Sequence, residues 1–270
     1  MKMERESEGE GIINPMGQTT SFVNQKGGVG KTTTTINLAA YLATFGKKVL
    51  LVDMDPQGNA SVGVGIDRNK IELCLYNVLI ENYPISAVIQ RTALNNLEIV
   101  PSTAKLAGAE VELVAEPERE IRLKNALFEI KDNYDYLLID CPPSLNLLTV
   151  NALTASDEVI IPIQCEYYAL EGISQLVKTL EMVREGLNPM LKIGGILLTM
   201  YDSRTVLANQ VVEEARRHFG KKVFQTIIPR NVRLAEAPSF GQPIIFYDPS
   251  SSGASAYENL SREVIGEYAA

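Results

Sequence analysis

The chain has 270 residues, of which 46% are hydrophobic and 21% charged, and its formal net charge is −8. This size and apolar content are typical of one or two globular domains with a sizeable core. One histidine and three cysteines, whose spacings fit no zinc or iron–sulfur pattern, exclude chemistry based on histidine clusters and argue against a disulfide framework.

The first 17 residues, MKMERESEGEGIINPMG, are polar, acidic and rich in glycine. They lack the apolar core of a signal peptide, and no apolar run in the chain reaches the ~18–20 residues that cross a bilayer. The sequence therefore predicts a flexible tail over residues 1–17, a single folded domain over residues 18–270, and a cytoplasmic protein.

Short apolar runs alternate with helical patterns along the rest of the chain. Several runs are continuously apolar, which is typical of strands buried on both faces of a parallel sheet. The predicted strands are residues 19–24, 48–55, 97–102, 134–140, 157–164, 193–200 and 223–229. The predicted helices are residues 31–46, 170–188, 206–220 and 252–270, with Gly46 and Gly220 at helix ends and Ser252 or Ser255 as a cap. This alternation predicts an α/β fold, with a mostly parallel, twisted sheet flanked by helices.

The segment NQKGGVGKTT, residues 24–33, lies between the first predicted strand and the first predicted helix. In such a loop, backbone N–H groups and the helix N-terminus form a cradle for phosphate. Gly27, Gly28 and Gly30 allow close approach around Val29, and the segment predicts a P-loop nucleotide-binding fold. The expected ligands of a bound nucleotide are Lys31 for the β- and γ-phosphates, the Thr32 hydroxyl for Mg²⁺, and Thr33 for the α-phosphate.

The loop departs from the common form of this motif. Gln25 stands where the first glycine is usual, and Lys26 precedes the glycines as a second lysine. On its own, Lys26 can also be read as a surface lysine beside a glycine turn.

Three aspartates follow or end predicted strands at the edge where open α/β sheets bind ligands. Asp140 fits a carboxylate that holds the Mg²⁺ shell, and Asp53 is expected to support that shell. Asp55 lies two residues after Asp53 in the turn DPQG. The alternative is that all three aspartates cap turns or helices.

Four segments together resemble the ParA/MinD family of deviant Walker A ATPases, and in particular the chromosomal ParA (Soj) proteins. They are QKGGVGKT, VLLVDMDPQGNAS (49–61), LLIDCPPS (137–144) and IIPRNVRLAEAPSFGQPI (227–244). The resemblance covers residue 19 to the C-terminus. It implies an ATPase with ATP and Mg²⁺ as cofactors, and a homodimer that forms when ATP binds.

The resemblance also implies residue roles. Lys26 would reach the partner's phosphates in the dimer, and a larger side chain at Gly27 would obstruct ATP-dependent pairing. Asp55 would position the attacking water, which makes Lys26, Lys31 and Asp55 the expected catalytic residues. Pro229 and Asn231 would hold the adenine base.

A basic segment lies within the acidic chain. Residues 184–236 contain nine Lys/Arg and five Asp/Glu, so the segment carries +4 and the remainder −12. By resemblance, Arg204 and Arg233 match arginines that bind double-stranded DNA without sequence preference, and Arg230 either flanks the base or contacts DNA. A second cluster either enlarges this patch or forms a solvated helix face: Arg216, Arg217, Lys221 and Lys222.

The sequence thus predicts a nucleoid-associated ATPase for chromosome or plasmid partitioning, with hydrolysis stimulated by a ParB-type partner. The alternative is a MinD-like membrane-associated positioning ATPase. The C-terminal SREVIGEYAA has few basic residues, which argues against binding to an anionic membrane. A metabolic enzyme on the same scaffold is a further alternative, for which the sequence gives no substrate pocket.

Overall fold

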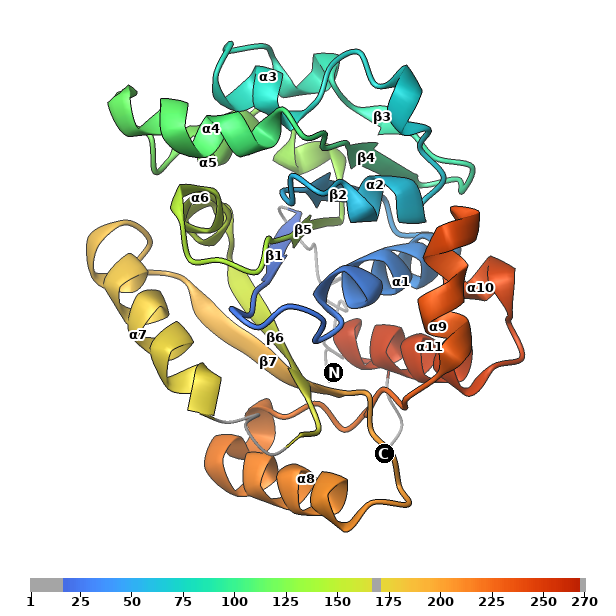
Figure 1. Cartoon of the computed structure of the whole chain (residues 1–270). Helices are drawn as coiled ribbons and strands as arrows, with labels where there is room; N and C mark the ends of the chain where they lie inside the picture. Colours follow the sequence, from blue (N-terminus) through green and yellow to red (C-terminus); the bar gives the residue numbers. More distant parts are fainter. Residues whose placement is uncertain (1–16, 167–170, 268–270) are drawn as a thin grey trace, which may run out of the picture.

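The protein is built around a seven-stranded sheet, seen in a computed structural model that describes residues 17–166 and 171–267 (Figure 1). The strand order is β3-β4-β2-β5-β1-β6-β7, and all neighbours are parallel except β3 and β4. The strands are β1 (Gln18–Phe22), β2 (Val49–Asp53), β3 (Gln90–Arg91), β4 (Leu97–Val100), β5 (Tyr136–Asp140), β6 (Glu158–Gln164) and β7 (Lys192–Thr199).

Continuous apolar runs form the central strands because helices cover both faces of the sheet. Every residue of β2 and β5 is buried. Their register pairs Val49 with Tyr136 and, at the carboxyl end, Asp53 with Asp140. Two strands that are distant in the sequence therefore bring two carboxylates side by side at one edge of the sheet.

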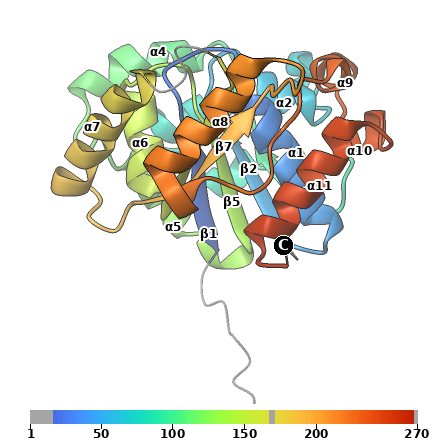
Figure 2. The ribbon, with the colours of Figure 1, turned by 90° about the horizontal axis from the view of Figure 1, so that it is seen from below.

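The helices form one layer on each face of the sheet (Figures 1 and 2). One layer and its core include α3 (Leu75–Leu79), α4 (Leu106–Glu112), α5 (Arg122–Phe128), α6 (Leu147–Ala155), α7 (Glu171–Gly186) and α8 (Val206–Phe219). The other includes α1 (Lys31–Thr44), α2 (Asn59–Gly63), α9 (Val232–Glu236), α10 (Ile244–Tyr247) and α11 (Ser252–Val264). All the helices described thus belong to one α/β domain.

The helix α1 is buried on nearly all sides. It lies between the sheet and α11, α2 and α10, so even its threonines Thr34 and Thr35 are fully buried. The Thr34 hydroxyl shares a hydrogen bond of 3.1 Å with the Tyr257 hydroxyl of α11. Because α1 follows the phosphate loop directly, this packing fixes the position of the loop's C-terminal end.

The sequence prediction is confirmed for six strands and three helices, within a few residues at their ends. The fourth predicted helix, residues 252–270, is confirmed only as far as Val264, where α11 ends, and residues 268–270 lie outside the described residues. The prediction of a strand over residues 223–229 is wrong. This segment has only isolated bridges, from Val223 to Ile196 and from Pro229 to Tyr201. Between them, the backbone N–H groups of Gln225 and Thr226 donate to the Glu263 carboxylate instead of a neighbouring strand.

Two smaller features also differ from the prediction. The antiparallel strand β3 was not predicted, because its two residues are too few to show a pattern. Neither Ser252 nor Ser255 caps α11. The cap is Ser251, whose hydroxyl accepts a hydrogen bond from Ala254 N at 3.1 Å.

The remaining sequence predictions concern the cysteines, the N-terminal tail and membrane-spanning segments. The three cysteines are free and buried, as small apolar residues are. Of the predicted tail, residues 1–16 lie outside the described residues, and Gly17 is buried. Within the described residues, no helix combines the length and the apolar character needed to cross a membrane.

Candidate functional site

The loop between β1 and α1 has the backbone of an anion cradle. Gly28 and Gly30 have φ values of +74° and +88°, which other residues rarely adopt. Asn24 anchors the start of the loop: its side-chain amide donates to Pro162 O of β6 at 2.7 Å, and its oxygen accepts from Lys26 N at 3.0 Å. The loop is therefore held in place at the edge of the sheet, where its N–H groups can bind phosphate.

The two lysines of the loop point to different places. Lys31 is buried, and its ammonium donates to the carbonyl of Lys26 at 3.2 Å, across the mouth of the loop. Burial lowers the pKa of Lys31, and the nearby charge of Asp140 partly offsets this effect. The Lys26 ammonium is half exposed and lies 3.2 Å from Glu166, at the end of β6. Lys31 is thus directed to its own loop, whereas the side chain of Lys26 is not.

A hydroxyl and a carboxylate lie together at the start of α1. The Thr32 hydroxyl donates to Asp140 at 2.7 Å, and the Thr35 hydroxyl donates to the other oxygen of Asp140 at 3.3 Å. Burial, followed by the charge of Asp53, raises the pKa of Asp140 to about 8. A positive ion at this position would stabilise the ionised carboxylate.

Asp53 forms its hydrogen bonds with the segment that follows its own strand, β2. Its carboxylate accepts hydrogen bonds from Ser61 N at 2.8 Å, from the Ser61 hydroxyl at 2.7 Å and from Asp55 N at 3.2 Å. Burial raises its pKa to about 6, although these bonds oppose the shift. The hydrogen bonds give Asp53 a structural function in holding the loop after β2, and its support of a metal shell stays a prediction.

Asp55 lies in that loop and is largely buried. One of its oxygens accepts a hydrogen bond from Gln57 N at 2.9 Å, in a turn that the chain makes over itself. Its other oxygen has no hydrogen-bond partner within residues 17–166 and 171–267. This free oxygen is available to a water molecule.

The arrangement fits Mg²⁺ bound with few protein ligands. Within the described residues, no group of three or more His, Cys, Asp or Glu side chains could hold a metal by itself. Mg²⁺ commonly keeps several waters and binds one or two protein groups together with nucleotide phosphates. Thr32 and Asp140 supply two oxygen ligands beside the phosphate cradle, which is the set of donors that this binding mode needs.

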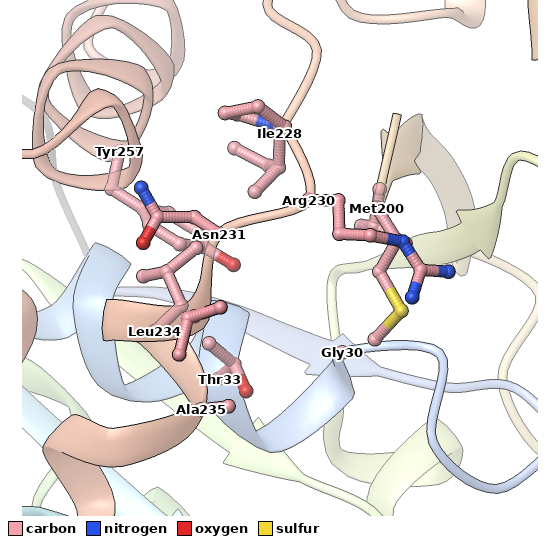
Figure 3. Close-up of a pocket in the computed structure, with 12 residues that line it drawn as sticks. Gly30, Thr33, Met200, Ile228, Arg230, Asn231, Leu234, Ala235 and Tyr257 are labelled. Atoms are coloured by element: carbon pink, nitrogen blue, oxygen red, sulfur yellow. The ribbon is translucent and has the colours of Figure 1, made fainter. Parts of the chain in front are cut away.

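A cavity of about 290 Å³ extends from the loop toward the C-terminal part of the chain (Figure 3). Four predicted nucleotide ligands line it: Gly30, Thr33, Pro229 and Asn231. The remaining walls are mainly apolar, and they include Met200, Leu234 and Tyr257. The cavity thus joins a phosphate cradle to an apolar space of the kind that a nucleobase fills.

The turn that carries Pro229 and Asn231 is fixed by backbone and side-chain bonds. Tyr201 N donates to Ile228 O at 3.1 Å, and Arg230 N donates to Tyr201 O at 2.9 Å. The Asn231 amide donates to the Ser252 hydroxyl at 2.9 Å. The turn is therefore attached both to the end of β7 and to the start of α11.

The three arginines predicted to bind DNA are exposed at this end of the molecule. Each is paired with a carboxylate of its own chain. Arg204 forms two bonds with Asp202, at 2.7 and 2.8 Å. Arg233 lies 2.9 Å from Glu236 and 3.4 Å from Asp248, and Arg230 lies 3.9 Å from Glu166.

Several residues of the site were not predicted from the sequence. Asn24 and Ser61 position the loops, and Thr199, Met200 and Tyr257 line the cavity. Met200 has a φ of +52°, which is uncommon outside glycine and asparagine. For Asn24 and Thr199, the one indication in the sequence was their position at or next to the carboxyl end of a predicted strand.

The fold and this site define a P-loop nucleotide hydrolase of the deviant Walker A type. The family model described as "AAA domain" matches residues 17–193. Soj from Bacillus subtilis is 58% identical over 92% of this chain and 98% of that protein, and ParA from Myxococcus xanthus is 57% identical over 93% and 88%. Cobyrinic acid a,c-diamide synthase from Mycobacterium smegmatis, solved with ADP and magnesium, has a TM-score of 0.81 and 37% identity, covering 93% of this chain and 94% of that one.

The chain belongs to the ParA/Soj family of chromosome-partitioning ATPases.

Proposed function

We propose that the protein is an ATP-dependent dimerising switch that binds DNA without sequence preference in its ATP state. The observation that carries the proposal is the position of Lys26. Its ammonium belongs to the phosphate loop in sequence but lies at Glu166, outside its own cradle. Because its ion pair with Glu166 is exposed and contributes little, Lys26 could leave it and act on a nucleotide held by a second copy of the chain.

ATP and Mg²⁺ are the cofactors, which is supported by the ADP and magnesium bound in the related synthase structure. The N–H groups around Gly28, Val29 and Gly30 bind the phosphates, and Lys31 neutralises their charge. Mg²⁺ would neutralise phosphate charge beside Thr32 and Asp140. Pro229 and Asn231 hold the base.

Hydrolysis depends on positioning more than on a strong base. The free oxygen of Asp55 accepts a hydrogen bond from water and directs it toward the γ-phosphate. Lys26 of a partner subunit adds positive charge where negative charge develops in the transition state. Turnover is therefore slow until the dimer is complete, which suits a switch.

The Gly27 position supports a partner on this face. A Cβ added there would have only Pro143 Cβ nearby, at 4.0 Å. The chain itself thus leaves room for a side chain. If a second copy packs on this face, a larger side chain at Gly27 would meet that copy and not its own chain.

DNA binding uses Arg204, Arg230 and Arg233. Exposed ion pairs contribute little to stability, so DNA phosphates can replace Asp202, Glu166 and the partners of Arg233 at small cost. Dimerisation brings two such sets of arginines together. Once one set has bound DNA, the other set is held close to the same duplex and binds it more easily. Affinity should therefore depend on ATP and fall steeply with salt.

A ParB-type partner that stimulates hydrolysis, and a cytoplasmic, nucleoid-associated location, complete the proposal. For a MinD-like membrane function, a free amphipathic helix would be needed. The last described helix, α11, instead packs its apolar face, including Ala254, Tyr257 and Leu260, against α1.

The decisive experiment measures binding of the full chain to a random-sequence DNA duplex with ADP and with ATP. Lys26→Ala and Arg233→Ala are compared with Arg91→Ala as a control. Arg91 is an exposed arginine on β3, the outermost strand on the side of the sheet away from β7. Binding with ATP only, lost in the first two variants and kept in Arg91→Ala, is the expected result. If the wild-type chain binds no DNA in either nucleotide at low salt, the partitioning switch is wrong. If Arg91→Ala loses DNA binding to the same extent, the DNA contact is not confined to the proposed arginines.

A further inference from the structure

The phosphate loop is tied to β7 by one buried hydrogen bond. The hydroxyl of Thr199, the last residue of β7, donates to the carbonyl of Val29 at 2.9 Å. Both residues are almost completely buried, with 2% and 1% of their surface exposed. Loss of the hydroxyl would therefore leave the largely buried carbonyl of Val29 without its protein partner.

We propose that Thr199 is a positioning residue that keeps the phosphate cradle open. The carbonyl of Val29 and the N–H of Gly30 belong to one planar peptide unit, in which they point in opposite directions. When Thr199 holds the carbonyl outward against β7, the Gly30 N–H points into the loop. Gly30 N–H makes no hydrogen bond within the described part of the chain, so it is available to a phosphate oxygen.

The loop needs such a restraint because its own residues do not provide it. Gly28 and Gly30 flank Val29, and glycine on both sides lets the intervening peptides rotate without a side-chain clash. A rotated Val29–Gly30 unit would turn a carbonyl oxygen toward the phosphate and repel it.

The other end of the bond is rigid. Thr199 O accepts a hydrogen bond from Cys165 N at 3.0 Å, and Tyr201 is bonded through its backbone to both Ile228 and Arg230. The end of β7 thus belongs to the sheet on one side and to the base-binding turn on the other. One strand end holds the phosphate side and the base side of the cavity in a fixed relation, which is the preorganisation that tight binding requires.

The test compares Mg²⁺–ADP affinity, measured by calorimetry on the full chain, in wild type, Thr199→Val and Thr199→Ser. Valine keeps the shape and removes the hydroxyl, so affinity should fall by about 10-fold or more, whereas serine should stay within about 3-fold of wild type. Thr19→Val is the matched control, since the hydroxyl of Thr19 is buried in β1 without a partner in the described residues. It should bind ADP as the wild type does.

The inference rests on the proposed nucleotide site, and the outcomes separate the two. A wild-type chain that does not bind Mg²⁺–ADP overturns both. Normal binding by Thr199→Val, or an equal loss in Thr199→Ser, overturns the function of Thr199 alone. Should Thr199→Val fail to fold, hydrogen exchange on the wild type decides: the Gly30 amide should become strongly protected when Mg²⁺–ADP binds, and an amide that stays unprotected refutes the orientation.

Discussion

The nucleotide-free protein is expected to become less stable as the pH rises, and replacing Asp140 with asparagine should remove much of this pH-dependent loss. Asp140 and Asp53 are register partners in β5 and β2, and both are fully buried. Burial and the charge of Asp53 raise the pKa of Asp140 to about 8. The folded chain therefore keeps a proton on Asp140 that the unfolded chain releases near pH ~4.

The size of the effect follows from this difference in bound protons. Where the folded state holds one proton more, the free energy of unfolding falls with pH, by about 1.4 kcal/mol per unit. The loss begins above pH ~4, where the unfolded carboxyl ionises, and it ends once the pH has passed the folded pKa of about 8. Between about pH 6 and about pH 8 it amounts to about 2 kcal/mol, because the folded carboxyl is partly ionised at the upper end. The amide of the Asp140→Asn variant would not titrate, and its oxygen could still accept from Thr32.

The assay is urea unfolding at about pH 6 and about pH 8, with a chelator and without nucleotide. Wild type should lose about 2 kcal/mol more than Asp140→Asn over this interval. Asp132→Asn, which changes an exposed carboxylate, should behave as the wild type does. An equal loss in wild type and Asp140→Asn would refute the reasoning, since the dependence would then come from other groups.

Three other substitutions test binding, dimerisation and packing separately. Gly27→Val should keep the melting temperature within about 2 °C of wild type, because an added Cβ would have only Pro143 Cβ nearby, at 4.0 Å. The same variant should abolish the ATP-dependent dimer in light scattering, and a normal dimer would contradict the proposed interface. Lys31→Ala should weaken Mg²⁺–ADP binding by about 10-fold or more in calorimetry, through loss of a charged contact, and unchanged affinity would remove Lys31 from the site. Tyr257→Phe should lower the free energy of unfolding by about 1 kcal/mol, since the buried Thr34 hydroxyl loses its partner; no change in urea unfolding would show that this bond contributes nothing.

Much of the fold could be predicted because its signals are local. Strands such as β2 and β5 are continuous apolar runs, and α1 begins directly after a glycine-rich loop. The error at residues 223–229 has a physical cause. The apolar pattern there is that of a buried segment, but the backbone donors of Gln225 and Thr226 bond to Glu263, which lies 38 and 37 residues further along the chain.

The candidate site divides in the same way. The sequence alone determined the phosphate loop and the order of the carboxylates, because Lys31 and Thr32 are adjacent and Asp53 and Asp140 end apolar strands. Only the tertiary structure decided which groups these residues meet. The bond from Thr199 to Val29 joins positions that are 170 residues apart, and the cavity joins Thr33 to Asn231. Such contacts depend on the register and packing of whole elements, which no local pattern encodes.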